Sequence, residues 1–256
     1  MPHRIMFGLQ KGGVGKTTST VAVAEKLASS GYRVLVVDFD SQGNTTRMLT
    51  GKSIYEYSGS TIMEAIQTGN ADPYIFGINA NLELIPAEDK LSTFSRYIYT
   101  SGMANPYAAL KRVLEPIEDS YDFVFIDVGP TLGDTVINAI VYVDHIIIPV
   151  DGGDLAMEAM VRFMEFIEAT REEGHTGAEV LGIAITMRDR RSKYEKDVSD
   201  MIRQAYGPLV FETEIGRRVK IKEMSAEGID LVEPAMEDYF SLTSEIMSRL
   251  REEGYK

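Results

Sequence analysis

The stretch Gln10-Lys11-Gly12-Gly13-Val14-Gly15-Lys16-Thr17-Thr18 decides how this chain folds. The apolar run Arg4–Leu9 comes directly before it and predicts a buried strand. The following residues, Ser19–Ala28, have a helical pattern that closes at Gly31. A strand, a glycine-rich loop and a helix in this order allow successive backbone N–H groups to surround a polyphosphate. The N-terminus of the helix adds its partial positive charge.

Individual residues of this loop have distinct expected roles. Gly12, Gly13 and Gly15 allow the backbone to approach the phosphates because they carry no Cβ. Lys16 is expected to neutralise oxygens of the β- and γ-phosphates, and the Thr17 hydroxyl to ligate Mg²⁺. The alternative is a chance glycine turn before a helix, which the surrounding strand and helix disfavour.

The loop also departs from the general phosphate-binding pattern. That pattern has a glycine five residues before Gly15, where this chain has Gln10, and this chain adds a second lysine, Lys11, at the head of the loop. In both respects the loop resembles the deviant Walker A motif of the ParA/MinD group of ATPases. The resemblance implies a weak ATPase with ATP and Mg²⁺ as cofactors. It also implies a nucleotide site formed by Lys11, Gly12, Gly13, Val14, Gly15, Lys16, Thr17 and Thr18.

Composition and length narrow the class of protein. A chain of 256 residues with 44% hydrophobic and 25% charged residues is ordinary for a globular protein of one α/β domain or two small ones. No apolar run is long enough to span a membrane, and the first residues carry no secretory pattern. The absence of cysteine excludes disulfides, thiolate zinc sites and iron–sulfur clusters, and the three histidines are scattered. We therefore expect a cytoplasmic location.

A second apolar run, Arg33–Asp38, predicts a strand that is buried on both faces. It leads into Asp38-Phe39-Asp40-Ser41-Gln42-Gly43-Asn44, which resembles the second motif of the same family, usually Asp-x-Asp-Pro-Gln-Gly-Asn, with Ser41 in place of proline. The resemblance implies that Asp40 holds or polarises the attacking water and that Asp38 supports the Mg²⁺ shell. The catalytic residues implied in this way are Lys11, Lys16 and Asp40. Acidic residues at a strand end can also be merely solvated, or can cap the next helix.

A third apolar run, Tyr121–Asp127, again predicts a buried strand that ends in an acidic residue. It resembles the Walker B strand, in which Asp127 would hold Mg²⁺ through water, because Mg²⁺ gives up its hydration shell reluctantly. The segment up to Pro130 would then sense the γ-phosphate. Family members usually have Thr or Cys and then Pro or Ala before this proline, and Val128-Gly129 departs from that pattern. The expected metal ligands are Thr17, Asp38 and Asp127.

The rest of the chain alternates between expected strands and helices. The further expected strands are Asn81–Pro86, His145–Val150, Glu179–Met187 and Leu209–Phe211. The further expected helices are Thr61–Ile66, with Thr61 as its N-cap, Leu155–Glu173 and Met236–Arg251. This alternation predicts a single α/β domain over residues 1–256, of the P-loop NTPase type, with a mostly parallel, twisted sheet and helices on both faces. Because the phosphate loop follows the first strand, the ligand is expected beyond the carboxyl ends of the strands.

A basic stretch near the end of the chain contrasts with the acidic average. The net charge is −13, yet Met187–Lys222 holds ten Lys or Arg and six acidic residues, so this stretch carries +4 and the remainder −17. Charges act locally because salt screens them beyond about 8 Å. Phosphate-backbone contact requires a stripe of Lys and Arg and no base-reading geometry. The expected DNA contacts are Arg188, Arg190, Arg191, Lys193, Arg217, Arg218, Lys220 and Lys222. A solvated charged face is the alternative.

The family resemblance also implies partners. Partition ATPases of similar length use arginines in these two regions for non-specific binding of double-stranded DNA. Two ATP-bound protomers of the family form a homodimer in which Lys11 of each would reach the phosphates of the other. A ParB-like centromere-binding protein would trigger hydrolysis, and the ATP-bound form would associate with the nucleoid. Met187 and Ile215 are implied as contacts of the adenine ring.

A MinD-like positioning ATPase, which acts at a membrane or on a protein cargo, is the alternative function. Membrane attachment of that kind requires a C-terminal amphipathic helix rich in basic and bulky apolar residues. The tail Ser248–Lys256 has one large aliphatic residue and two acidic residues, so we expect no membrane partner. Related metal-cluster carriers and arsenite pump ATPases use cysteine, which this chain lacks. The cargo, whether a plasmid, a chromosome or a protein cluster, stays open.

Overall fold

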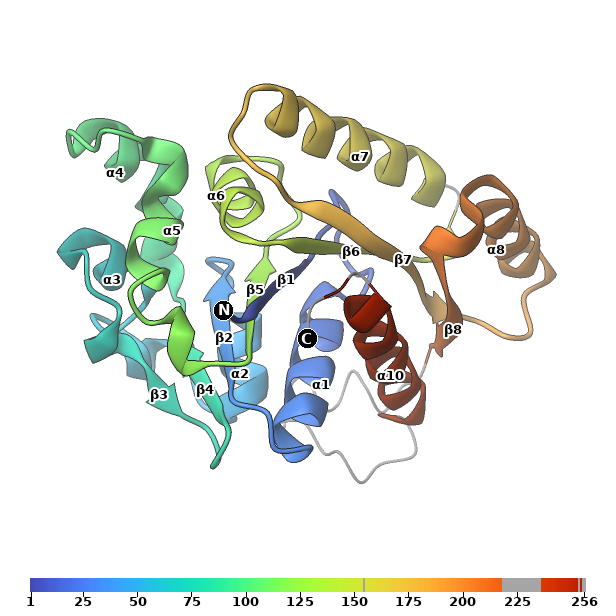
Figure 1. The fold of residues 1–256 in the computed structure, drawn as a ribbon, viewed down its shortest axis with the longest axis horizontal. Helices are drawn as coiled ribbons and strands as arrows, with labels where there is room; N and C mark the ends of the chain where they lie inside the picture. Colours follow the sequence, from blue (N-terminus) through green and yellow to red (C-terminus); the bar gives the residue numbers. More distant parts are fainter. Residues whose placement is uncertain (154, 218–235, 253, 255–256) are drawn as a thin grey trace.

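A computed structural model describes residues 1–153, 155–217, 236–252 and 254. Within these residues eight strands form one sheet, in the order β3-β4-β2-β5-β1-β6-β7-β8 (Figure 1). The strands are β1 His3–Phe7, β2 Val34–Phe39, β3 Phe76–Gly77, β4 Leu82–Ile85, β5 Phe123–Val128, β6 His145–Val150, β7 Glu179–Arg188 and β8 Val210–Gly216.

The described helices connect and cover these strands. They are α1 Lys16–Ser29, α2 Asn44–Thr50, α3 Ile62–Thr68, α4 Phe94–Thr100, α5 Ala109–Leu114, α6 Asp134–Tyr142, α7 Ala156–Glu172, α8 Lys193–Tyr206 and α10 Glu237–Glu252. Short 3₁₀ turns lie at Ile54–Tyr57, Asp72–Tyr74, Asp89–Thr93, Pro106–Ala108, Glu118–Ser120 and Gly207–Leu209. The expected α/β fold with a mostly parallel sheet is confirmed. All strand pairings in the described residues are parallel except that of β3 with β4, which is antiparallel.

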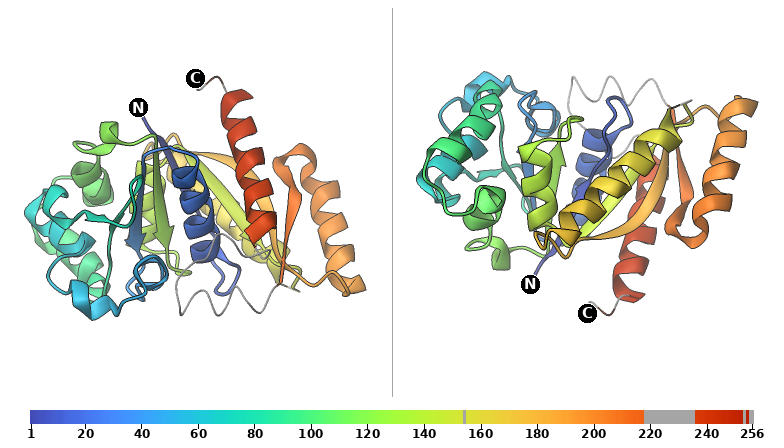
Figure 2. Two further views of the ribbon diagram at one scale, coloured as in Figure 1. Left: turned by 90° about the horizontal axis from the view of Figure 1, so that it is seen from below. Right: turned by 90° about the horizontal axis from the view of Figure 1, so that it is seen from above.

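Alternate residues of the central strands face two different cores. Ile5 and Phe7 of β1 pack with residues of α1 and α10, whereas Met6 packs with residues of α3 to α8. This follows from the two-residue period of a strand, and it explains why the central strands are apolar without interruption. Figure 2 shows the result, with α1 and α10 over one face of the sheet and α6 and α7 over the other.

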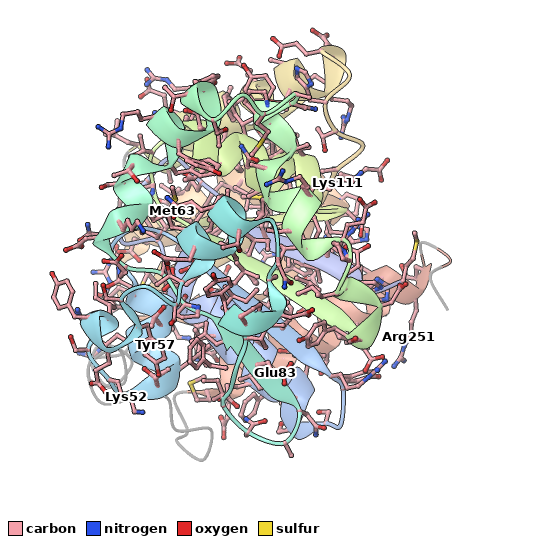
Figure 3. All side chains as sticks on the ribbon, turned by 90° about the vertical axis from the view of Figure 1, so that its left-hand side faces the viewer. Lys52, Tyr57, Met63, Glu83, Lys111 and Arg251 are labelled. Carbon is pink, nitrogen blue, oxygen red and sulfur yellow. The ribbon has the colours of Figure 1, made fainter. Side chains whose placement is uncertain are left out.

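One edge of the sheet is closed by short elements. Figure 3 looks onto this edge, where Glu83 of β4 and Met63 of α3 are labelled. Met63 is fully buried, and the Glu83 carboxylate accepts a hydrogen bond from the Tyr121 hydroxyl. The expected N-cap at Thr61 is confirmed, since its side chain accepts from the Met63 N–H and forms a capping box with Glu64. These contacts fix the β4 side of the molecule.

The boundaries of the expected elements hold to within a few residues, except that the last strand extends to Gly216, beyond the expected Leu209–Phe211. No helix was predicted at α2, α6 or α8. None of the helices in the described residues is both long enough and apolar enough to cross a membrane.

Candidate functional site

The phosphate loop connects β1 to α1 in a conformation that only glycine adopts easily. Gly13 and Gly15 have φ angles of 76° and 81°, in the left-handed region. Gly15 is the N-cap of α1, and no side chain of the described residues caps this helix. The N–H groups of its first turn are therefore available to an anionic ligand.

Lys16 is the first residue of α1 and points its ammonium back over the loop. Its Nζ donates to the backbone oxygen of Lys11 at 2.8 Å, and the residue is 7% exposed. Burial lowers the pKa of Lys16, while the nearby charges of Asp127 and Asp40 oppose that shift. A buried ammonium in this position is stabilised by an anionic ligand such as a phosphate group.

Asp127 and Asp38 lie side by side at the carboxyl ends of β5 and β2. The two residues are paired in the sheet register, and both are fully buried. Oδ2 of Asp127 accepts hydrogen bonds from Thr17 Oγ1 at 2.8 Å and Thr45 Oγ1 at 2.7 Å. The other oxygen, Oδ1, is buried with no hydrogen-bond partner among the described residues.

The electrostatics of this pair favour a cation. Burial raises the pKa of Asp127 to about 6, and burial followed by the charge of Asp127 raises the pKa of Asp38 to about 8. An unpartnered, buried carboxylate oxygen beside the Thr17 hydroxyl fits Mg²⁺, which binds proteins through one or two carboxylates and completes its shell with phosphate and water. A group of three acidic, histidine or cysteine ligands is not found in the described residues.

Asp38 has a different role from Asp127, because its oxygens are already occupied. Oδ2 accepts from the backbone N–H and the hydroxyl of Thr46, at 2.8 and 2.7 Å, and Oδ1 accepts from the N–H of Asp40 at 3.2 Å. Asp38 therefore fixes the start of α2 and the backbone of Asp40. Its contribution to a metal site is therefore indirect, through the backbone that it holds in place beside Asp127.

Asp40 lies at the mouth of the site, against the backbone of Gly129. A Cβ at Gly129 would lie 3.2 Å from the Asp40 carboxyl carbon. The Asp40 Oδ1 accepts from the N–H of Gln42 at 3.1 Å. The departure of Gly129 from the family pattern thus leaves space for the Asp40 carboxylate.

A cavity of about 360 Å³ joins these residues. Its lining consists of Gly12, Gly13, Gly15, Lys16, Thr17, Thr18, Asp40, Gln42, Asn44, Met48, Val128, Pro130 and Met187. Met187 has a φ of 53°, a left-handed conformation that is uncommon for a residue other than glycine. Val14 and Ile215, by contrast, are buried in the core, with exposures of 0% and 1%, and they do not line the cavity.

Sequence reasoning did not single out Thr45, Thr46 and Asp151. The two threonines hydrogen-bond Asp127 and Asp38, and they directly follow the motif that contains Asp40, so their proximity was a usable signal. Asp151 forms an ion pair with Lys11, with 2.6 Å between Lys11 Nζ and Asp151 Oδ1.

A larger cavity, of about 720 Å³, lies at the opposite end of the strands. Arg4 in its wall is bound to Asp144 through two hydrogen bonds and lies 3.6 Å from Glu118. The charge of Arg4 is therefore satisfied within the protein, and we place the nucleotide in the smaller cavity because the phosphate loop lines it.

The basic stretch divides into exposed and buried residues. Arg190, Arg191, Lys193 and Arg217 are exposed, and we call these four residues the basic surface. The N–H of Arg217 donates to the Arg188 oxygen at 2.9 Å, which brings the two clusters together at the ends of β7 and β8. Arg218, Lys220 and Lys222 lie outside the described residues.

Arg188 does not belong to the basic surface. It is 7% exposed, its Nε lies 3.3 Å from Glu214, and its Nη1 donates to the backbone oxygens of Asp189 and Ser192. Its guanidinium therefore holds the end of β7 in place and does not reach solvent.

Known proteins are similar to this chain in sequence over most of its length. A family model described as an AAA domain matches residues 3–179. The chain is 30% identical to the chromosome-partitioning ATPase Soj of Treponema pallidum, over 90% of this chain and 89% of that protein. It is 31% identical to the chromosome partitioning protein ParA of Caulobacter vibrioides, over 100% of this chain and 98% of that protein.

A solved structure shares the fold. The cobyrinic acid a,c-diamide synthase from Mycobacterium smegmatis, with bound ADP and magnesium, superposes with a TM-score of 0.84 over 99% of this chain and 97% of that chain. Its sequence identity is 24%, so the likeness concerns the fold and not the reaction.

Proposed function

This chain belongs to the ParA/Soj family of partition ATPases, and on that premise we propose that residues 1–256 form one domain that couples ATP hydrolysis to reversible DNA binding. ATP-bound protomers pair into a homodimer, the dimer binds double-stranded DNA of any sequence, and a ParB-like centromere-binding protein stimulates hydrolysis and release. The observation that carries the proposal is that Lys16 and Thr17 of the phosphate loop line one cavity, where the Thr17 hydroxyl donates to Asp127.

Nucleotide binding follows from the loop and the two carboxylates. The backbone N–H groups at the start of α1 and the ammonium of Lys16 bind the phosphates. Thr17 and Asp127 would hold Mg²⁺, with Asp38 beside them, and the ion would supply charge neutralisation at the phosphate oxygens. Met187, which lines the cavity, contacts the adenine ring, whereas Ile215 is buried in the core and makes no such contact.

Hydrolysis requires a positioned water more than covalent chemistry by the protein. Asp40 is the carboxylate at the cavity mouth, and its backbone is fixed by Asp38. We assign Asp40 to orient the attacking water. Slow intrinsic hydrolysis keeps the protein in its ATP-bound form until the partner protein accelerates the reaction.

Pairing of protomers gives Lys11 its role. Lys16 already covers the phosphates of its own protomer, and Lys11 lies at the rim of the loop with a side chain that is 26% exposed. A lysine in this position can reach a phosphate that a second protomer presents. Each lysine would then neutralise charge in the other site.

DNA binding is assigned to the basic surface, despite the net charge of −13. Arg190 and Arg217 are 68% and 56% exposed and lie at the same end of the sheet as the nucleotide. A homodimer doubles the number of phosphates that this surface engages, so DNA binding depends on ATP. On this proposal the ATP-bound dimer is located on the nucleoid, in the cytoplasm.

A MinD-like action at a membrane is less compatible with the described part of α10. Its apolar residues Leu242, Ile246 and Leu250 are buried against the sheet, so they are not available for insertion into lipid. Action on a protein cargo would use the same ATP-dependent dimer.

Replacement of Asp40 by alanine is expected to separate binding from hydrolysis. Because Asp40 orients water and does not hold the phosphates, the Asp40→Ala protein should bind ATP and pair as the parent does, while turnover falls by about 10²- to 10⁴-fold. Phosphate release gives the turnover and light scattering gives the mass. A protein that stays monomeric with ATP would show that Asp40 has a structural role instead.

Replacement of Lys11 by alanine should give the complementary defect. ATP should still bind to each protomer through Lys16, but the pair should not form, because the phosphates of the partner lose their second cation. Light scattering with a non-hydrolysable ATP analogue tests this, and calorimetry checks that the analogue binds. A normal dimer of the Lys11→Ala protein would contradict the assignment of Lys11.

A further inference from the structure

Lys11 has a counter-charge within its own protomer. Its Nζ lies 2.6 Å from Oδ1 of Asp151, which follows directly after the last residue of β6. The two side chains are 26% and 19% exposed, so the ion pair is partly shielded from water. The contact joins the loop that follows β1 to the loop that follows the neighbouring strand β6, within one protomer.

The Asp151 carboxylate is held in this position by its surroundings. Its Oδ1 accepts the N–H of Gly153 at 3.4 Å. A Cβ at Gly153 would lie 3.2 Å from Lys11 Nζ, so glycine at this position leaves room for the ammonium. Gly152 is packed so closely on α8 that a Cβ would lie 2.6 Å from Glu195 Cγ and 3.2 Å from its Cα. The segment that carries the carboxylate therefore packs closely against α8.

We propose that Asp151 is a positioning residue that competes with the partner's nucleotide for Lys11, and so sets the protein concentration at which ATP-bound protomers pair. This inference rests on the proposed role of Lys11 in the dimer. While Lys11 is held at 2.6 Å from Asp151, its side chain is directed at its own protomer, so it has to leave this carboxylate to extend to a phosphate of the other protomer. Pairing therefore has to break two of these ion pairs, one in each protomer.

The size of the effect follows from the exposure of the pair. Partly exposed ion pairs contribute little, and the same interaction is lost twice when a dimer forms. Removal of the Asp151 charge should therefore tighten the dimer by about 2- to 30-fold. A stronger effect would require a fully buried pair.

Asp151→Asn is the variant that isolates the charge, because the asparagine oxygen can still accept the N–H of Gly153. Dimer dissociation constants should be measured by light scattering over a series of protein concentrations, with saturating Mg²⁺ and a non-hydrolysable ATP analogue. We expect a lower dissociation constant than in the parent. Asp151→Ser also keeps an oxygen acceptor and should shift the constant in the same direction, which covers a failure of the first variant to fold.

Two further variants separate a competition for Lys11 from a general effect of charge. In a Lys11→Ala background, which is not expected to pair, Asp151→Asn should not restore the dimer at any protein concentration of the series, since there is no ammonium to release. Asp122→Asn removes the same charge from the ion pair with Arg33 and should leave the dimer unchanged. A gain that persists without Lys11, or that Asp122→Asn reproduces, would overturn the proposal.

The outcomes also separate this inference from the proposed function. A parent protein that pairs with the ATP analogue, together with an Asp151→Asn protein that pairs equally or less well, would overturn the competition and leave the proposed function intact. A parent protein that does not pair at all would overturn both.

Discussion

Replacement of Lys16 by alanine is expected to reduce the affinity for ATP by on the order of 10²- to 10³-fold, because it removes the cation of a largely buried charge pair. Lys16 is 7% exposed, so water cannot replace the ammonium at the phosphates. The variant should in consequence lose every behaviour that depends on nucleotide, including pairing and DNA binding. No other single substitution at the phosphate loop is expected to have as large an effect.

Titration calorimetry with Mg²⁺ and ATP measures this loss directly. Lys26→Ala is the matched control, since it removes the same charge from the same helix, near its C-terminal end, where Lys26 lies over the Phe240 ring. The control should bind ATP normally, and thermal melting should show that both variants are folded. If the Lys16→Ala protein binds ATP with the affinity of the parent, the loop does not bind phosphate as we infer.

The phosphate loop and the sheet around it could be predicted from sequence because their physical causes are local. Strands that are buried on both faces are apolar without interruption. The phosphate loop follows β1, and β2 and β5 each carry an aspartate next to their last residue, where a nucleotide and Mg²⁺ would bind. Parallel connectivity then brings Asp38 and Asp127 to the same edge of the sheet.

The helix α8 was not predicted because its charge obscured its pattern. Val198 and Ile202 are buried at helical spacing, but the rest of Lys193–Tyr206 is strongly polar. A local signal was nevertheless present, because Ser192 caps the helix and accepts from the N–H of Glu195. The density of charged residues instead favoured a solvent-exposed surface for the whole stretch.

The roles of Arg188 and Ile215 depend on tertiary contacts that charge counting does not reveal. Arg188 is the last residue of β7 and forms an ion pair with Glu214 on the neighbouring strand β8, so its guanidinium is buried and does not form part of the basic surface. Ile215 is buried near the end of β8, in the core that also contains residues of α1 and α10, which removes it from the cavity. Asp151 is 140 positions from Lys11, and the pairing of β6 with β1 brings the two together.

The second large effect is expected at the basic surface. The triple variant Arg190→Ala, Arg191→Ala and Arg217→Ala should weaken the binding of ATP-bound protein to every DNA sequence alike. If the three arginines of both protomers each neutralise one phosphate, the slope of log affinity against log salt falls by about 5. If the two proteins bind DNA equally at about 1 M salt, this change of slope corresponds to a loss of up to about five orders of magnitude in DNA affinity at about 0.1 M salt.

The measurement is a mobility-shift titration at several salt concentrations, with Mg²⁺, a non-hydrolysable ATP analogue and two unrelated duplexes. The control is a triple variant of equal charge change, Arg33→Ala, Lys111→Ala and Arg162→Ala, at positions outside the basic surface. Light scattering should show that both triple variants pair with the analogue, which separates loss of DNA contact from loss of the dimer.

Two arginines of the basic surface lie close to carboxylates, which compete with DNA phosphates for them. Arg190 lies 3.3 Å from Asp238, and Arg217 lies 3.5 Å from Glu195, so each arginine must exchange a carboxylate for a phosphate when DNA binds. Exposed ion pairs of this kind contribute little, and the high charge density of DNA favours the exchange. If the triple variant keeps the DNA affinity and the salt slope of the parent, these arginines stay paired with their carboxylates. The basic surface is then a solvated face that does not bind DNA.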